Sequence, residues 1–224
     1  MNKKVEIIPA ILPKTFKELE ESVASIQGLV KSVQIDICDG KFVPNATWPY
    51  RKRDDSFEMI IREQQGLPFW EKLDYEFDLM VSNPCEVVDD WVKAGATRII
   101  IHAESEGVAE AIKKLDNRVE VGLALNIETP ISATEPFKEM IQFVQCMGIR
   151  HVGFQGQAFD GEVIEKIKAI RLEYPDVIIS IDGGVSLENA KQLIEAGVNR
   201  LVVGSVIFDS ENIINTIRQF RDLV

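Results

Sequence analysis

The chain has 224 residues, of which 46% are hydrophobic, and its formal net charge is −11. This size and hydrophobic content suit one α/β domain with a substantial buried core. The acidic balance argues against nucleic acid or an anionic membrane as a partner, because both require a basic surface. A small anionic substrate stays possible, since it responds to local charge.

The composition also bears on the compartment. The amino-terminal residues contain no long apolar region followed by a cleavage site. No stretch approaches the roughly 18 apolar residues of a membrane span. Cys38, Cys85 and Cys146 are widely spaced and odd in number, which favours three free thiols over a disulfide framework or a zinc finger. We therefore expect a soluble cytoplasmic protein.

Short β-rich runs alternate with amphipathic runs throughout the chain. Strands are expected at Val5–Leu12, Val33–Ile37, Tyr75–Val81, Arg98–His102, Val119–Leu125, Ile141–Met147, Val177–Ile181 and Arg200–Val203. Helices are expected at Lys17–Gln27, Phe57–Gln65, Glu86–Ala94, Gly107–Leu115, Ser132–Met140, Glu162–Glu173, Leu187–Ala196 and Asn212–Val224. Eight such repeats predict parallel strands with right-handed crossovers. The favoured fold is an α/β, (β/α)8 TIM barrel forming a single domain over residues 1–224, and a doubly wound open sheet is the alternative.

The alternation of side chains along each strand places one carboxyl group from each of three strands inside the barrel. The apolar residues of the second strand share one face, and Gln34 and Asp36 share the other. The same alternation turns Asp78 and Asp182 away from the apolar faces that must pack against helices. Active sites of this fold lie where such residues are expected, at the C-terminal ends of the strands. Carboxylates this close require a cation or a shared proton, unless they are instead solvated loop residues.

Glycine-rich turns follow the last three expected strands. Glycine lets the backbone approach a phosphate group closely, and backbone N–H groups bind it. Barrels of this kind often hold phosphate with the loops after strands seven and eight. The residues predicted to bind phosphate on this basis are Gly153, Gln155, Gly156, Gly183, Gly184, Gly204 and Ser205. Ordinary tight turns are the alternative interpretation.

Several motifs in this order resemble the ribulose-phosphate 3-epimerase family over nearly the whole chain. They are the segments 35–45 (IDICDGKFVPN), 78–81 (DLMV), 123–126 (LALN), 153–157 (GFQGQ), 181–185 (IDGGV) and 204–208 (GSVIF). The resemblance implies a barrel that binds a phosphorylated ketose and inverts C3 through a cis-enediolate. It assigns the two proton transfers to Asp36 and Asp182.

The resemblance also implies a divalent cation held by two histidines and these two aspartates. Gln34 and Asp78 stand at the histidine positions here. A ligand set of Gln34, Asp36, Asp78 and Asp182 is all oxygen, which favours magnesium or manganese over zinc. Exchanging a neutral imidazole for a carboxylate adds one negative charge, which disfavours an enediolate unless a cation offsets it.

Other residues are placed around the substrate by the same resemblance: Ala10, Cys38, Met80, His102, Asn126 and Met147. Ala10 stands where the family has a serine, and Cys38 replaces a methionine that shields the intermediate. His102 either takes a direct part in the site or makes a structural contact, whereas His151 is expected in a loop. Arg51, Lys52 and Arg53 form a basic run. This run either reaches an anionic substrate, or it is a solvated charge run or a contact between subunits.

The leading functional hypothesis is therefore an epimerase of a ribulose 5-phosphate-like ketose. A phosphate-binding or regulatory protein with lost or weak catalysis is the second. A lyase on a phosphorylated sugar is the third, and it is disfavoured because the related decarboxylase and synthase barrels carry an Asp-x-Lys-x-x-Asp signature. The segment from Asp36 to Asp39 lacks that lysine. The resemblance further implies a homo-oligomer.

Overall fold

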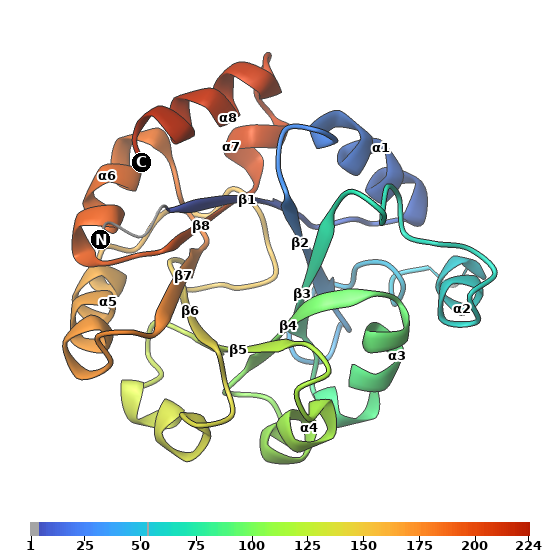
Figure 1. The fold of residues 1–224 in the computed structure, drawn as a ribbon, viewed down its shortest axis with the longest axis horizontal. Coiled ribbons are helices and arrows are strands. Elements are labelled where there is room, and N and C mark those ends of the chain that lie inside the picture. The colour runs from blue at the N-terminus through green and yellow to red at the C-terminus, as the bar shows by residue number, and fades with distance from the viewer. Residues whose placement is uncertain (1–4, 53) are drawn as a thin grey trace.

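A computed structural model describes residues 5–52 and 54–224 of the protein. Eight parallel strands pair in chain order and β8 pairs with β1, which closes the barrel (Figure 1). The strands are β1 (Glu6–Ile11), β2 (Ser32–Cys38), β3 (Asp74–Met80), β4 (Ala96–His102), β5 (Glu120–Leu125), β6 (Phe143–Met147), β7 (Ile178–Asp182) and β8 (Arg200–Val203). The TIM barrel predicted from the sequence is confirmed, and closure excludes the open sheet.

The helices surround this barrel (Figure 1). They are α1 (Phe16–Ile26), α2 (Ser56–Ile61), α3 (Val88–Lys93), α4 (Val108–Leu115), α5 (Glu162–Glu173), α6 (Leu187–Ala196), α7 (Ser205–Phe208) and α8 (Ile213–Asp222), with 3-10 turns η1 (Pro84–Glu86) and η2 (Ile131–Phe137). Within the described residues, three expectations need correction. The helix expected at Ser132–Met140 is the 3-10 segment η2, which contains Pro136. The helix expected at Glu86–Ala94 begins only at Val88, as α3, after the 3-10 turn η1, and the helix expected at Phe57–Gln65 ends at Ile61, as α2. The short α7 was not expected.

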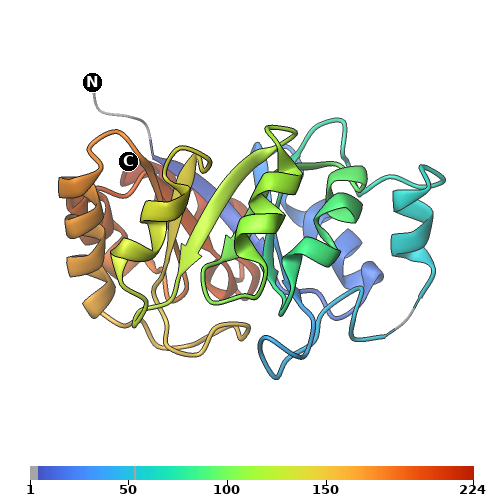
Figure 2. The same cartoon turned by 90° about the horizontal axis from the view of Figure 1, so that it is seen from below.

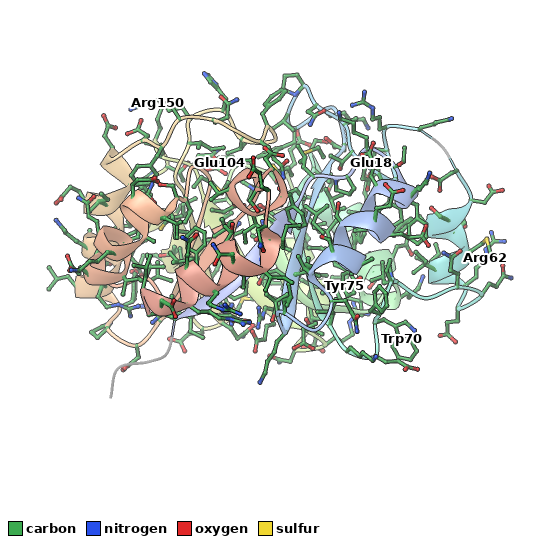
Figure 3. All side chains as sticks on the ribbon, turned by 90° about the horizontal axis from the view of Figure 1, so that it is seen from above. Glu18, Arg62, Trp70, Tyr75, Glu104 and Arg150 are labelled. Atoms are coloured by element: carbon green, nitrogen blue, oxygen red, sulfur yellow. The ribbon has the colours of Figure 1, made fainter. Side chains whose placement is uncertain are left out.

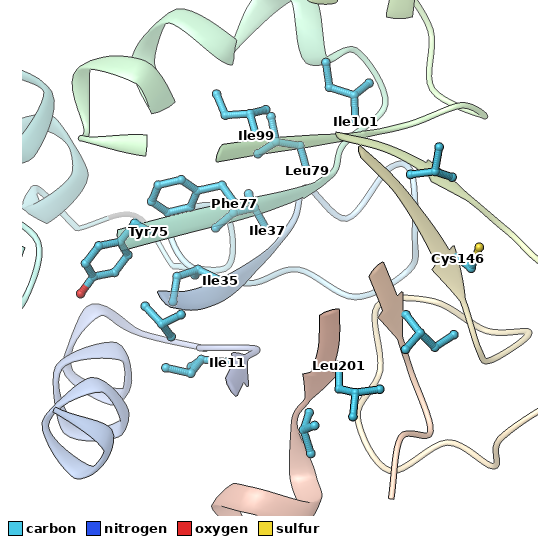
Figure 4. Packing of buried hydrophobic residues seen from close by; sticks show 14 of the residues in the cluster. Ile11, Ile35, Ile37, Tyr75, Phe77, Leu79, Ile99, Ile101, Cys146 and Leu201 are labelled. Atoms are coloured by element: carbon cyan, nitrogen blue, oxygen red, sulfur yellow. The ribbon is translucent and has the colours of Figure 1, made fainter. Parts of the chain in front are cut away.

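Side-chain alternation along the strands builds two separate environments. Ile35, Ile37, Phe77 and Leu79 are fully buried in the layer between the strands and the helices (Figure 4). Burying such side chains contributes about 1.5–3 kcal/mol each relative to leaving them exposed. The opposite faces of the same strands turn the polar residues of β2 and β3 into the barrel, as the sequence predicted.

Residues at its two ends determine where α6, the helix that follows β7, begins and ends. Ser186 and Asn189 form a reciprocal capping box at the start of α6, with the Asn189 side chain accepting the Ser186 N–H at 2.8 Å. Gly197 ends the helix with φ +114°, a left-handed conformation that favours glycine. The ends of α6 are therefore set by its own sequence, and its first turn lies beside the glycine turn after β7.

The long β2–α2 connection is held by an aromatic cluster. Trp48 is 1% exposed, and its ring lies 5.4 Å from that of Phe16, 5.5 Å from that of Phe57 and 6.0 Å from that of Trp91. Its indole N–H donates to Ser56 Oγ at 2.8 Å. This connection and the β6–α5 connection project from the same end of the barrel (Figure 2).

The basic run lies in this connection. Arg51 and Lys52 are exposed, and Arg53 lies outside the described residues. Cys38, Cys85 and Cys146 are free thiols. Across the described segments, no helix is both long and apolar enough to cross a membrane.

The amino-terminal end of the barrel is closed by ion pairs. Arg98 Nη1 lies 3.3 Å from Glu76 Oε2, and Arg98 Nε lies 3.3 Å from Glu120 Oε2. Arg200 Nε lies 3.5 Å from Glu6 Oε2. Glu6, Glu76 and Glu120 therefore each have an arginine partner at this end. Inward carboxylates at the other end have a different set of neighbours, and these define the candidate site.

Candidate active site

Three aspartates from three strands meet inside the barrel. Asp36 and Asp78 are register partners on β2 and β3, and Asp182 ends β7. Carboxylate oxygens of all three lie within 4.8 Å of one another, and each residue is at most 8% exposed. The convergence expected from the strand pattern is therefore present.

Gln34 joins two of these aspartates. Its Nε2 donates to Asp36 Oδ1 at 2.8 Å and to Asp182 Oδ2 at 2.7 Å. One side-chain amide thus bridges two carboxylates whose residues lie 146 positions apart in the chain. The two groups are held at fixed positions on either side of that amide.

The electrostatic environment favours protons on these two groups. Burial raises the pKa of Asp36, and the charges of Asp182 and Asp78 raise it further. Burial and the charge of Asp78 raise the pKa of Asp182 to about 7, against the lowering effect of the Gln34 hydrogen bond. In the absence of a cation the pair therefore retains a proton near neutral pH. An aspartate pair of this kind can both accept and return a proton.

Asp78 has a different set of partners. His102 Nε2 lies 3.1 Å from Asp78 Oδ1, and Gln145 Nε2 donates to Asp78 Oδ2 at 3.1 Å. Burial lowers the pKa of His102, but the charge of Asp78, the hydrogen bond with Asp78 and the charge of Glu104 outweigh burial and raise it to about 10. His102 is therefore a cation at neutral pH. It offsets part of the negative charge that Asp78 brings to the cluster of three carboxylates.

Glu104 and Gln145 belong to this network, although sequence reasoning missed both. Glu104 Oε2 lies 3.6 Å from His102 Nδ1, while its other carboxylate oxygen accepts the backbone N–H of Asn126 at 3.0 Å and the Thr129 hydroxyl. It lies toward the end of the barrel that carries the active-site mouth (Figure 3). Gln145 carried a usable signal, because it is a polar residue on the inward face of an otherwise apolar strand.

The acidic cluster fits a divalent cation. Gln34 Oε1 is buried and has no hydrogen-bond partner among the described residues. An unpaired amide oxygen beside three carboxylates offers an all-oxygen donor set of the kind that hard cations prefer. Asp36, Asp78 and Asp182 can thus hold a metal ion. Rotation of the Gln34 amide would exchange its two hydrogen bonds to Asp36 and Asp182 for a fourth oxygen ligand.

A pocket of about 270 Å³ opens beside Asp36 and Asp182. All residues predicted to bind phosphate line it: Gly153, Gln155, Gly156, Gly183, Gly184, Gly204 and Ser205. Ala10, Met80 and Met147 line it as well. The remaining predicted site residues, Gln34, Cys38, Asp78, His102 and Asn126, are absent from the lining formed by described residues.

Close packing explains why glycine follows β7. Gly183 and Gly184 have φ values of +98° and +68°, which side-chain-bearing residues rarely adopt. A Cβ atom on Gly184 would lie 2.7 Å from Phe159 Cα, and one on Gly183 would lie 2.8 Å from Ile149 Cγ1. The turn after β7 therefore packs directly against the β6–α5 connection, with both turns facing the pocket.

Cys38 and His151 take a smaller part in the candidate site than the three aspartates do. Burial, followed by the charges of Asp36 and Asp78, raises the pKa of the Cys38 thiol well above its ordinary value. Its Sγ lies 3.9 Å from Met80 Sδ, so it is a neutral part of an apolar wall. His151 is exposed on the β6–α5 connection, as expected for a loop residue.

Known proteins of similar fold share this architecture. The 3-keto-L-gulonate-6-phosphate decarboxylase from Vibrio cholerae O1 superposes with a TM-score of 0.71 at 13% identity, covering 98% of this chain and 97% of that one. The 3-hexulose-6-phosphate synthase from Salmonella typhimurium superposes with a TM-score of 0.70 at 12% identity, covering 98% of both chains. At such identities the likeness concerns the fold.

Sequence comparison is more specific. The chain is 30% identical to ribulose-phosphate 3-epimerase from Synechocystis over 231 residues, which cover 99% of this chain and 95% of that protein. It is 31% identical to the chloroplastic ribulose-5-phosphate-3-epimerase from Arabidopsis thaliana, covering 96% of this chain and 75% of that protein. A model of the ribulose-phosphate 3 epimerase family matches residues 6–208. The chain therefore belongs to the ribulose-phosphate 3-epimerase family.

Proposed function

We propose that the protein is an epimerase of a phosphorylated ketose similar to ribulose 5-phosphate, and that it inverts C3 through an enediolate. The observation that carries this proposal is the pair Asp36 and Asp182, held through the Gln34 amide at 2.8 and 2.7 Å beside the glycine-lined pocket. The site thus combines two proton-transfer groups with a place for an anion. Family membership supports the same chemistry.

The phosphate group is proposed to lie against the turns at the rim of this pocket. Backbone N–H groups of Gly153, Gly156, Gly183, Gly184 and Gly204, with Ser205, supply its hydrogen bonds. Phosphate bound there fixes the position of the sugar relative to the two aspartates. The acidic net charge of the chain is compatible with this site, since backbone dipoles supply the local field.

The proton transfers are divided between the two strands. One aspartate removes the proton from C3 as a base, and the other, in its protonated form, returns a proton to the opposite face. The raised pKa values of Asp36 and Asp182 support this division, because a carboxyl group whose protonated form is favoured can donate a proton as well as accept one. Met80 and Met147 form part of the apolar wall around the intermediate.

Gln34, Asp36, Asp78 and Asp182 are the proposed ligands of a magnesium or manganese ion. A bound divalent cation stabilises negative charge that develops on the ketose oxygens. The imidazolium of His102 remains paired with Asp78 and limits the net charge of the ligand set. A homo-oligomeric state and a cytoplasmic location remain predictions from the family resemblance and the sequence.

Incorporation of solvent deuterium tests the proposal. The protein, supplied with magnesium or manganese and incubated with D-ribulose 5-phosphate in deuterium oxide, is expected to label C3 and to form the C3 epimer, both visible by NMR. Binding of the sugar phosphate without labelling would instead support the alternative of a phosphate-binding or regulatory protein. Release of formaldehyde or carbon dioxide would identify a lyase.

A further inference from the structure

The β1 side of the pocket presents hydrocarbon where a sugar needs polar partners. Ile8, Ala10 and Val202 form a small apolar cluster inside the barrel. Ala10 and Val202 also line the pocket that contains Asp36 and Asp182. A buried hydroxyl group without a hydrogen bond is unfavourable. A hydroxyl of the sugar that lies on this side therefore requires a partner from another element.

Gln155 brings a side-chain amide to this side. Its Nε2 donates to the backbone oxygen of Ala10 at 3.3 Å, across 145 positions of sequence. A Cβ atom on Gly204 would lie 3.2 Å from the same nitrogen, so glycine at the end of β8 leaves room for the amide. The β6–α5 connection is fixed on its other side, where Asn45 Nδ2 donates to the Gly153 oxygen at 2.8 Å. The connection thus crosses the end of the barrel (Figure 1).

The chemistry of an amide suits this position. At 3.3 Å the contact with Ala10 is longer than the usual N–H···O range, so it holds the amide only weakly. The amide retains a second N–H and a carbonyl oxygen that can bind a hydroxyl group. The amide is neutral, so it adds no charge to a pocket that Asp36 and Asp182 also line.

We propose that Gln155 is a specificity-determining residue whose amide hydrogen-bonds a hydroxyl group of the sugar on the β1 side of the pocket. This inference rests on the proposed function, and it gives Gln155 a different role from the neighbouring glycines. Its side chain recognises the sugar, whereas the backbone of the turns holds the phosphate. Ala10 supplies the contact that directs the amide, through its backbone oxygen.

Titration calorimetry on the full chain separates the two roles. The dissociation constants of D-ribulose 5-phosphate and of inorganic phosphate are measured for the wild type, Gln155→Ala and Gln157→Ala. Loss of one hydrogen bond corresponds to about a tenfold change. Gln155→Ala is expected to weaken sugar-phosphate binding about tenfold while changing phosphate binding less than twofold. Gln157 lines the same pocket, and its substitution is expected to leave the ratio of the two constants unchanged.

A second variant makes the test independent of loop damage. Adding Ala10→Ser to Gln155→Ala places a hydroxyl on the same wall and is expected to restore at least threefold of the lost affinity. Equal weakening of both ligands by Gln155→Ala would show a phosphate-binding role and overturn the inference. If Gln155→Ala left both dissociation constants unchanged, the inference would be overturned too. If the wild type does not prefer the sugar phosphate over inorganic phosphate, the proposed function fails along with the inference.

Discussion

His102 Nε2 lies 3.1 Å from Asp78 Oδ1, and both side chains are fully buried. The pair places a positive charge directly beside a cluster of three carboxylates. A carboxylate with a buried imidazolium partner contributes less net negative charge to its surroundings than an isolated one. This relationship explains how the barrel accommodates Asp78 as a third buried carboxylate beside Asp36 and Asp182.

The His102–Asp78 pair makes stability depend on pH. The pKa of His102 is about 10 in the folded protein and about 6.5 when unfolded. Its stabilising effect is therefore fully present below pH 6.5 and is lost as the pH rises toward 10. His102→Gln is expected to lower the free energy of unfolding by about 3 kcal/mol at pH 6, and by less at pH 9.5. Urea denaturation at both pH values measures this difference in the free energy of unfolding.

The chain contains a matched control for that substitution. His151 is its other histidine, and it is exposed. His151→Gln is expected to change the free energy of unfolding by no more than about 0.5 kcal/mol at either pH. A constant difference between wild type and His102→Gln from pH 6 to 9.5 would show that the ion pair does not exist in solution.

The two proposed acid/base residues are expected to be separable from phosphate binding. Asp36→Asn and Asp182→Asn each keep the shape of the side chain but cannot transfer a proton. Each is expected to reduce C3 deuterium exchange about 10²–10⁴-fold, and to change the dissociation constant of inorganic phosphate less than about threefold. NMR and calorimetry provide the two measurements. Wild-type exchange rates in both variants would remove these residues from the mechanism.

Metal binding is expected to compete with protons. The pKa of Asp182 is about 7 and that of Asp36 is also raised, so protons occupy the site at acidic pH. Manganese should therefore raise the melting temperature more at pH 8 than at pH 5.5. Asp78→Asn is expected to weaken manganese binding about 10–100-fold, as measured by calorimetry at pH 8. Tightly bound stoichiometric zinc in the purified protein, found by elemental analysis, would contradict the predicted metal preference.

Backbone geometry at Gly184 is expected to control phosphate binding. Gly184→Ala introduces a Cβ 2.7 Å from Phe159 Cα and must displace the turn. The dissociation constant of inorganic phosphate should rise at least about tenfold, and the free energy of unfolding should fall by about 1–3 kcal/mol. Gly28→Ala is the control, because Gly28 also has a positive φ of +79° and no atom within 4 Å of the added Cβ, and it lies outside the pocket. Equal effects of the two substitutions on phosphate binding would argue against this role for Gly184.

Much of the architecture was encoded locally. The eight strands and their order followed from alternating apolar residues, and α5 and α6 have the predicted bounds. The same alternation turned Asp36, Asp78 and Asp182 inward, because successive side chains on a strand point to opposite faces. Glycine placement likewise located the turns that now line one pocket. These features depend on neighbours within a few positions of the chain.

Only the closed barrel decided which inward side chains touch. Gln34 meets Asp182 across 148 positions, and His102 meets Asp78 across 24, through the relative placement of strands and side-chain rotation. The alternation along a strand gives the face on which a side chain lies, but neither its hydrogen-bond partner nor its protonation state. The raised pKa of Asp182 and the cationic state of His102 depend on burial and on charges brought together by that closure. The sequence thus determined the fold and the positions of the acidic residues, while the tertiary structure decided their charge.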